Sequence, residues 1–139
     1  MTAPSYTRMR VLLADDTPEI RRLLRLNLEL DGRFEIVGEA ADGAEAVALA
    51  ASLHPDAVVL DLAMPVMDGL QAIPVILESS PAARILVLSG FDHSRMEARA
   101  REQGAHGYLE KGAAFVQIAD TLVELGAEGL TAGSRQPAR

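Results

Sequence analysis

The sequence contains no cysteine, no tryptophan and no long apolar run. The absence of cysteine excludes a disulfide framework, a cysteine-ligated metal site and a thiol nucleophile. The apolar stretch at 57–67 is interrupted by Asp61, and no stretch approaches the roughly 18 apolar residues of a membrane helix. Residues 1–10 lack the apolar core of a secretion signal. These absences together favour a cytoplasmic protein without a membrane segment.

The charge balance is acidic. The chain has 139 residues, of which 13 are basic and 20 acidic, giving a net charge of −7. Because phosphate neutralisation needs a basic face, and no basic helix-turn-helix follows residue 130, we expect no direct nucleic-acid binding by this segment. The hydrophobic share of 49% excludes wholesale disorder, and the length fits a single domain.

Short apolar runs alternate with stretches of helical periodicity along the chain. The apolar runs predict strands at 9–14, 34–37, 57–60, 84–88 and 107–109. Helices are predicted at 18–31, 42–53, 69–79 and 92–103, with a last helix from 115. Thr17, Asp42, Asp68 and Asp92 are the predicted N-caps. Pro74 should kink the third helix or delay its start.

This alternation predicts an α/β fold. Five strands separated by helices imply right-handed crossovers and a parallel sheet with helices on both faces. We expect one domain over residues 8–130. Residues 131–139 contain Gly, Ser and Pro without an apolar period, so they are predicted to be a flexible tail or the start of a linker.

Polar side chains stand at the carboxyl ends of four predicted strands, where ligands bind in open parallel sheets. They are Asp15 and Asp16 after the first strand, Asp61 after the third, Ser89 after the fourth and Lys111 after the fifth. Singly, Asp15 and Asp16 can be helix-start acids, Ser89 a turn serine and Lys111 a solvated lysine. Asp61 alone already favours a function, because a bare carboxylate directly after an apolar strand is costly. Together they indicate one site.

The chemistry of this set points to a phosphoryl group. Three neighbouring carboxylates repel one another unless a cation intervenes, and Mg²⁺ prefers such oxygen ligands. A serine hydroxyl and a lysine ammonium suit phosphoryl oxygens. An aspartate carboxylate can itself act as a nucleophile, so in-line phosphoryl transfer to Asp61 is the predicted reaction.

These residues lie in motifs that strongly resemble the receiver domain of two-component response regulators. The matching stretches are the pair Asp15–Asp16, the segment 59–69 (VLDLAMPVMDG), Leu88-Ser89-Gly90 and the segment 104–111 (GAHGYLEK). The resemblance runs from about residue 8 to about residue 126. It implies a flavodoxin-like, doubly wound sheet with the strand order 2-1-3-4-5.

The resemblance also implies residue roles. Asp61 would accept a phosphoryl group from the phosphohistidine of a sensor histidine kinase, or from a small donor such as acetyl phosphate. The chain would then be a stoichiometric phosphoacceptor, with self-catalysed transfer and dephosphorylation, that controls a downstream output domain or protein. The implied ligands of Mg²⁺ are the carboxylates of Asp15, Asp16 and Asp61 and the backbone carbonyl of Ala63. Ser89 and Lys111 would bind the phosphoryl oxygens. A shift of Ser89 toward that group would let Tyr108 swing inward, repacking the face of the fourth helix, fifth strand and fifth helix.

One position departs from the family pattern, and two consequences of the resemblance stay open. Gly112 follows Lys111 where the family usually has proline, which should make this loop more mobile. The stretch before Lys111 resembles receivers that often precede a helix-turn-helix domain, so the chain is either a stand-alone receiver or part of a longer regulator. Homodimer formation on phosphorylation is compatible with the resemblance, but the sequence does not indicate an interface.

Two other functions compete with this interpretation. A phosphatase of the haloacid dehalogenase type also uses an aspartate nucleophile and Mg²⁺, but it needs a second acid two residues later, where this chain has Ala63. A flavin or dinucleotide module needs a phosphate-binding loop after the first strand, and the acids at 15 and 16 would repel a bare phosphate.

Overall fold

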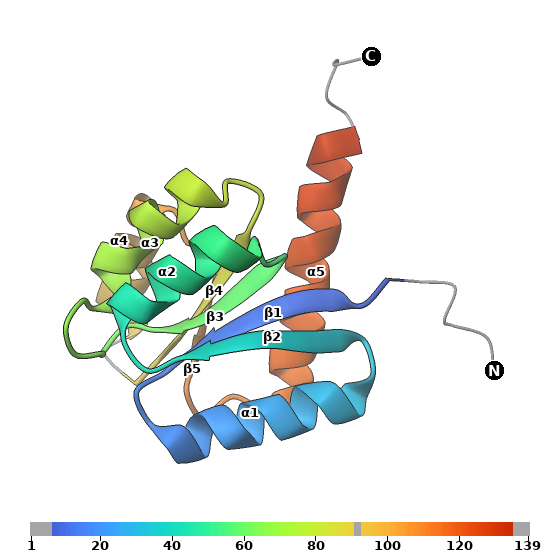
Figure 1. Ribbon diagram of the computed structural model, residues 1–139, viewed down its shortest axis with the longest axis horizontal. Helices are drawn as coiled ribbons and strands as arrows, with labels where there is room; N and C mark the ends of the chain where they lie inside the picture. Colours follow the sequence, from blue (N-terminus) through green and yellow to red (C-terminus); the bar gives the residue numbers. More distant parts are fainter. Residues whose placement is uncertain (1–6, 91–92, 135–139) are drawn as a thin grey trace.

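A five-stranded parallel sheet forms the centre of the molecule, in the order β2-β1-β3-β4-β5 (Figure 1). The computed structural model describes residues 7–90 and 93–134. The strands are β1 (Met9–Ala14), β2 (Phe34–Ala40), β3 (Ala57–Asp61), β4 (Arg84–Ser89) and β5 (Gly107–Glu110). The helices are α1 (Pro18–Asp31), α2 (Gly43–Leu53), α3 (Gly69–Ser79), α4 (His93–Gln103) and α5 (Phe115–Ser134). The predicted fold class and strand order are therefore confirmed.

Helices cover both faces of this sheet, with α2, α3 and α4 on one side and α1 and α5 on the other (Figure 1). Side chains of alternate residues in the central strands pack in the two apolar layers between the sheet and its helices. Leu12, Val58 and Val87 belong to the first layer, whereas Leu13 and Val59 belong to the second. All five residues of β3 are buried, as expected for a central strand covered on both faces. Within the described residues, no helix is long and apolar enough to span a membrane.

The starts of the helices can be compared with the predicted N-cap residues. Asp68 forms a full capping box with Gln71, and Asp42 accepts a hydrogen bond from the backbone of Glu45. Thr17 occupies the N-cap position of α1 but makes no side-chain cap bond. Pro74 lies inside α3, which nevertheless begins at Gly69, so the alternative of a delayed start was wrong. The predicted cap at Asp92 lies outside the described residues.

Two elements are longer than predicted. β2 continues through Ala40, three residues beyond the predicted end at 37, because its pairing with β1 persists past Gly38 and Glu39. α5 continues through Ser134, so residues 131–134 of the predicted tail are helical. The remaining residues of that tail, 135–139, lie outside the described part of the chain, and the domain boundary at 130 remains a prediction.

His106 links β4 and β5 at their amino-terminal ends, opposite the carboxyl ends where Asp15 and Asp61 lie. Its backbone N–H donates to the carbonyl of Ile85 at 2.9 Å, and its Nδ1 accepts the N–H of Ile85 at 2.9 Å. That ring nitrogen therefore carries no proton. Burial lowers the pKa of His106 below its ordinary value of 6.5, and the charge of Arg84 lowers it further.

This arrangement predicts a loss of stability at mildly acidic pH. As the pH decreases, the unfolded chain binds the histidine proton at a higher pH than the folded chain does. The free energy of unfolding should therefore fall between pH 6.5 and the lowered pKa of the folded state. The expected loss is about 1 kcal/mol, the usual contribution of one hydrogen bond. Urea unfolding of wild type and His106→Gln at pH 7.5 and 5.5 measures it. An equal decline in both proteins would contradict the prediction, since the glutamine does not titrate.

Candidate functional site

Three aspartates converge at the carboxyl edge of the sheet. Ala14 pairs with Leu60 in the β1–β3 ladder, so Asp15 and Asp61, the next residues of each chain segment, are neighbours. Each is only 3% exposed, whereas Asp16 faces solvent. One carboxylate oxygen from each of the three lies within 4.8 Å of the others. The predicted convergence of these acids is thus present in the structure.

Lys111 bridges the two buried carboxylates. Its Nζ lies 3.1 Å from Oδ2 of Asp15 and 3.1 Å from Oδ2 of Asp61. Its backbone N–H donates to the carbonyl of Ser89 at 3.0 Å, which ties the residue to the end of β4. Burial lowers the pKa of Lys111, but the hydrogen bonds that it donates to the two carboxylates outweigh this effect and the net shift is upward. The ammonium is therefore charged at neutral pH.

The surroundings of Asp61 oppose ionisation of its carboxyl group. Burial raises its pKa above the ordinary value, and the charge of Asp15 raises it further. Opposing these are hydrogen bonds from Lys111 and from the backbone N–H of Ala63, which lies 3.1 Å from Oδ1. The net shift of the pKa is upward, so these two hydrogen bonds do not offset the cost of burying the charge. Among the residues that the structure describes, one ammonium, that of Lys111, stands beside the three carboxylates. Three oxygen donors with uncompensated negative charge fit a hard divalent cation such as Mg²⁺.

Backbone hydrogen bonds fix the loop that follows Asp61. The N–H of Gly69 donates to the carbonyl of Leu62 at 2.9 Å, and the N–H of Gly43 donates to the carbonyl of Met67 at 2.9 Å. Both glycines are needed, because a Cβ atom at either position would collide with these backbone segments. The loop that carries Ala63 is thereby held against the starts of α2 and α3.

Ser89 and Tyr108 lie on the β4–β5 side of the site. Ser89 ends β4, one residue beyond the Asp61 partner Leu88, and is 1% exposed. Tyr108 pairs with Val87 in the ladder and is 6% exposed, within the apolar layer beneath α2, α3 and α4. The tyrosine ring is therefore already buried in this structure. The coupled movement of the two residues remains a prediction.

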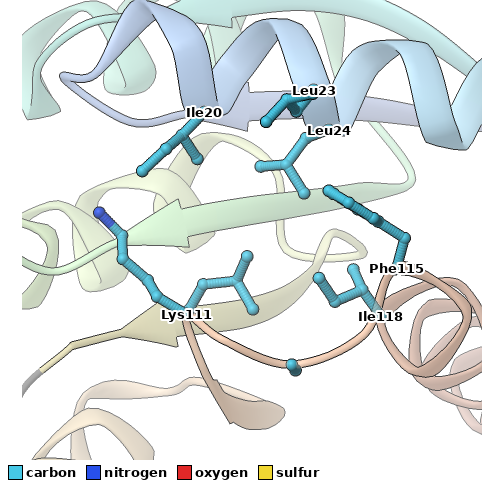
Figure 2. Close-up of a pocket in the computed structure, with 8 residues that line it drawn as sticks. Ile20, Leu23, Leu24, Lys111, Phe115 and Ile118 are labelled. Carbon is cyan, nitrogen blue, oxygen red and sulfur yellow. The ribbon is translucent and has the colours of Figure 1, made fainter.

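An apolar hollow of about 130 Å³ adjoins the site between α1 and α5. Figure 2 shows the aliphatic stem of Lys111 along its wall, with the ammonium on the side away from Phe115. The residues that line the hollow are Ile20, Leu23, Leu24, Leu88, Lys111, Ala113, Phe115 and Ile118. Apolar packing as well as ion pairing thus positions the ammonium. A Cβ atom at Gly112, the residue after Lys111, would meet no atom within 4 Å, so the backbone there is uncrowded.

Several contacts of the site were not apparent from the sequence. The N–H of Thr17 donates to Oδ1 of Asp15 at 2.8 Å, and Nη1 of Arg21 donates to the Asp15 carbonyl at 2.6 Å. Arg21 lies in an amphipathic helix with two other arginines, Arg22 and Arg25, and nothing in the sequence distinguishes it from them. Gly43 supports the Asp61 loop from a helix start that is distant in sequence.

Comparison with known proteins gives a consistent result. Residues 11–123 match the family model described as the response regulator receiver domain. The transcriptional regulatory protein LiaR of Bacillus subtilis is 39% identical over 114 residues, which cover 82% of this chain and 54% of that protein. The chain spans about half the length of the curated transcriptional regulators that it matches in this way.

Solved structures agree in fold along most of the chain. The signal receiver domain of NarL from Mycobacterium tuberculosis superimposes with a TM-score of 0.82 at 33% identity, covering 86% of this chain and 97% of that one. A LuxR-family two-component response regulator from Aurantimonas sp. also gives a TM-score of 0.82 at 33% identity, covering 88% of this chain and 87% of that one.

Proposed function

This chain belongs to the response regulator receiver domain family of two-component systems, and on that premise we propose that Asp61 accepts a phosphoryl group in a Mg²⁺-dependent reaction. The donor we propose is the phosphohistidine of a sensor histidine kinase. The observation that carries this proposal is the buried Asp61 carboxylate, held between Lys111 and a second buried acid at the carboxyl edge of the sheet.

The proposed transfer is an in-line displacement at phosphorus. A carboxylate oxygen of Asp61 forms the new P–O bond while the P–N bond to the donor histidine breaks and the imidazole leaves with its electron pair. When bound, Mg²⁺ would neutralise charge on the phosphoryl oxygens and the acids. The carboxylates of Asp15, Asp16 and Asp61 with the carbonyl of Ala63 would hold it. Lys111 already lies within reach of Asp61, and Ser89 lies on the adjacent strand end, so these two would contact the phosphoryl oxygens.

We propose that phosphorylation signals through the β4–β5 side of the domain to an output domain or protein. Several relatives are transcriptional regulators of which the matched residues cover only about half, which supports such an output. In this proposal Ser89 and Tyr108 are the switch residues, and association of two phosphorylated copies is one route to the output. The chain would act in the cytoplasm, where a sensor kinase presents its phosphohistidine.

A dehalogenase-type phosphatase is not favoured. In the structure, the position of its general acid is Ala63, whose N–H contacts Asp61 and whose side chain carries no proton to donate. The decisive experiment incubates the protein with acetyl phosphate and Mg²⁺ and measures intact mass. We expect one phosphoryl group per chain, lost on mild base treatment as an acyl phosphate. Continuous release of phosphate from simple phosphate esters, with no phosphorylated protein, would instead support the phosphatase.

The metal-binding role of the exposed acid can be tested separately. Asp16→Ala should weaken Mg²⁺ binding roughly tenfold, or about 1.4 kcal/mol, because one of three carboxylate ligands is lost. Its fold should be unaffected, since Asp16 faces solvent. Titration of Mg²⁺ followed by amide chemical shifts gives the affinity.

Glu19→Ala is the matched control for this variant. Glu19 is also an exposed acid, in the first turn of α1, but it does not belong to the aspartate cluster. The two variants change the net charge equally, so a general electrostatic effect would weaken binding to the same extent in both. Equal affinities in the two variants would argue against Asp16 as a ligand.

A further inference from the structure

We propose that Arg21 is a positioning residue for the metal-binding acids, acting through the backbone carbonyl of Asp15. This inference rests on the proposed function, because it assigns the pair Asp15–Asp16 to Mg²⁺. It concerns a residue of α1 whose side-chain hydrogen bonds, within the described part of the chain, go to Glu39 and to the Asp15 carbonyl.

The Arg21 guanidinium joins the acid pair to the end of β2. Its Nη1 donates to the Asp15 carbonyl at 2.6 Å, and its Nε donates to Oε1 of Glu39 at 3.1 Å. On the other side of the same residue, the Asp15 N–H donates to the carbonyl of Ala40 at 3.0 Å. Both backbone polar groups of Asp15 are therefore tied, directly or through Arg21, to two consecutive residues of β2.

Glu39 is a suitable anchor for this contact. Its Oε2 accepts a second hydrogen bond at 2.7 Å from Nη1 of Arg25. The hydrogen bond from Arg25 lowers the pKa of Glu39, burial opposes this, and the hydrogen bond from Arg21 lowers it again. The net shift of the pKa is downward, so Glu39 is ionised at neutral pH. It holds the Arg21 guanidinium through Nε, while Nη1 of the same group donates to the Asp15 carbonyl.

The held carbonyl belongs to the peptide between the two acids. Its orientation sets the direction in which the chain continues into Asp16, the exposed member of the three-aspartate cluster. Asp15 itself is fixed by Thr17 and Lys111 through its side chain. Arg21 thus restrains the peptide between Asp15 and Asp16, and with it the position of Asp16, the exposed carboxylate of the cluster. Preorganised ligands bind metal more tightly because less ordering remains to be done on binding.

Arg21 is proposed to act through its hydrogen bond to the Asp15 carbonyl and not through its charge. A cation near the site would by itself disfavour Mg²⁺, but the charges of Arg21 and Arg25 are balanced by two carboxylates, Glu39 between them and Glu29 beside Arg25. The Arg21 side chain is 17% exposed, compared with 44% for Arg25, so its hydrogen bonds are the better shielded from water. Removal of Arg21 should therefore weaken Mg²⁺ binding, although it removes a positive charge.

Arg25 supplies a matched control for a purely structural effect. It also bonds to Glu39 from α1, but the described residues show no hydrogen bond between it and Asp15. Arg21→Met and Arg25→Met each keep an apolar stem and each remove one charge and one Glu39 contact. Only Arg21→Met releases the Asp15 carbonyl.

The test measures Mg²⁺ dissociation constants of wild type and both variants by amide chemical shifts, together with thermal melting without metal. We expect about tenfold weaker binding for Arg21→Met, as for the loss of a residue that orients a metal ligand, and a change below about twofold for Arg25→Met. Arg21→Lys should give an intermediate affinity, because one ammonium reaches the carbonyl or Glu39 but does not reproduce the fork.

Equal Mg²⁺ affinities of Arg21→Met and Arg25→Met would overturn the inference, whatever their melting temperatures. Should Arg21→Met not fold, Arg21→Lys decides in the same way, and wild-type affinity in that variant overturns it. Failure of the proposed function looks different: the wild-type protein would then neither bind Mg²⁺ at this site nor take up phosphoryl from acetyl phosphate.

Discussion

Replacement of Asp61 by Asn should abolish phosphoryl uptake from acetyl phosphate in the presence of Mg²⁺. The amide has no anionic oxygen to form an acyl phosphate, and it removes one of the three carboxylates that favour a divalent cation. Neither remaining carboxylate replaces it, because Asp15 is engaged by Thr17 and Lys111, and Asp16 lies outside at the exposed rim. Intact-mass measurement should show the phosphorylated species for wild type and none for the variant.

The loss should not result from unfolding. Asn has nearly the shape of Asp, and its side-chain oxygen can still accept the hydrogen bond that Ala63 N–H donates to Oδ1. The hydrogen bond from Lys111 to Oδ2 is lost, but Lys111 keeps its ion pair with Asp15. Burial raises the pKa of Asp61, so removal of the buried charge offsets the lost contact with Lys111. We therefore expect Asp61→Asn to melt no lower than wild type in metal-free buffer.

Asp68→Asn is the matched control for the nucleophile. Asp68 lies seven positions later, in the same loop, and its side chain caps α3. Asparagine caps helices as well as aspartate does, so the variant should fold and take up phosphoryl like wild type. Undiminished uptake by Asp61→Asn, or equal loss in both variants, would refute the assignment of Asp61 as the acceptor.

The site was predictable to the extent that topology alone determines it. Parallel strands bring their carboxyl ends to one edge, so the residue that follows each strand can be assigned to that edge from the strand pattern. Asp15, Asp61 and Ser89 were placed in this way, and each is buried at that edge. The uninterrupted apolar run of β3 likewise indicated a strand covered on both faces.

Contacts between distant segments were not predictable in this way. The hydrogen bond from Gly43 to Met67 depends on how the α2 start meets the Asp61 loop, and no periodicity encodes that meeting. Lys111 was predicted to contact a phosphoryl group. Its ion pair with Asp15 was not predicted, because that contact depends on the side-chain conformation of Lys111. The end of β2 was predicted too early because Gly38 and Glu39 have weak strand propensity. In the structure, pairing with β1 overrides that weak propensity.

Gly69 is the position at which the smallest substitution should have a large effect on the loop. A Cβ atom placed there would collide with the carbonyl oxygen of Asp61 and lie 2.8 Å from the Cα of Leu62, and both of these are backbone atoms. A flexible side chain could move aside, but these backbone atoms belong to Asp61, the proposed phosphoacceptor, and to its neighbour Leu62. Any relief of the collision must therefore displace the Asp61 backbone or the start of α3.

Gly69→Ala should accordingly destabilise the domain by about 1–3 kcal/mol, the usual effect of overpacking, and slow phosphoryl uptake as well. The bond from the Gly69 N–H to the Leu62 carbonyl, 2.9 Å long, would be strained by the same displacement. Gly112→Ala is the control, since a Cβ there meets no atom within 4 Å, and its stability should stay within about 0.5 kcal/mol of wild type. Urea unfolding and the rate of phosphorylation by acetyl phosphate test both. If the two variants were equally stable and equally fast, the close approach of Gly69 to Asp61 would not constrain the site.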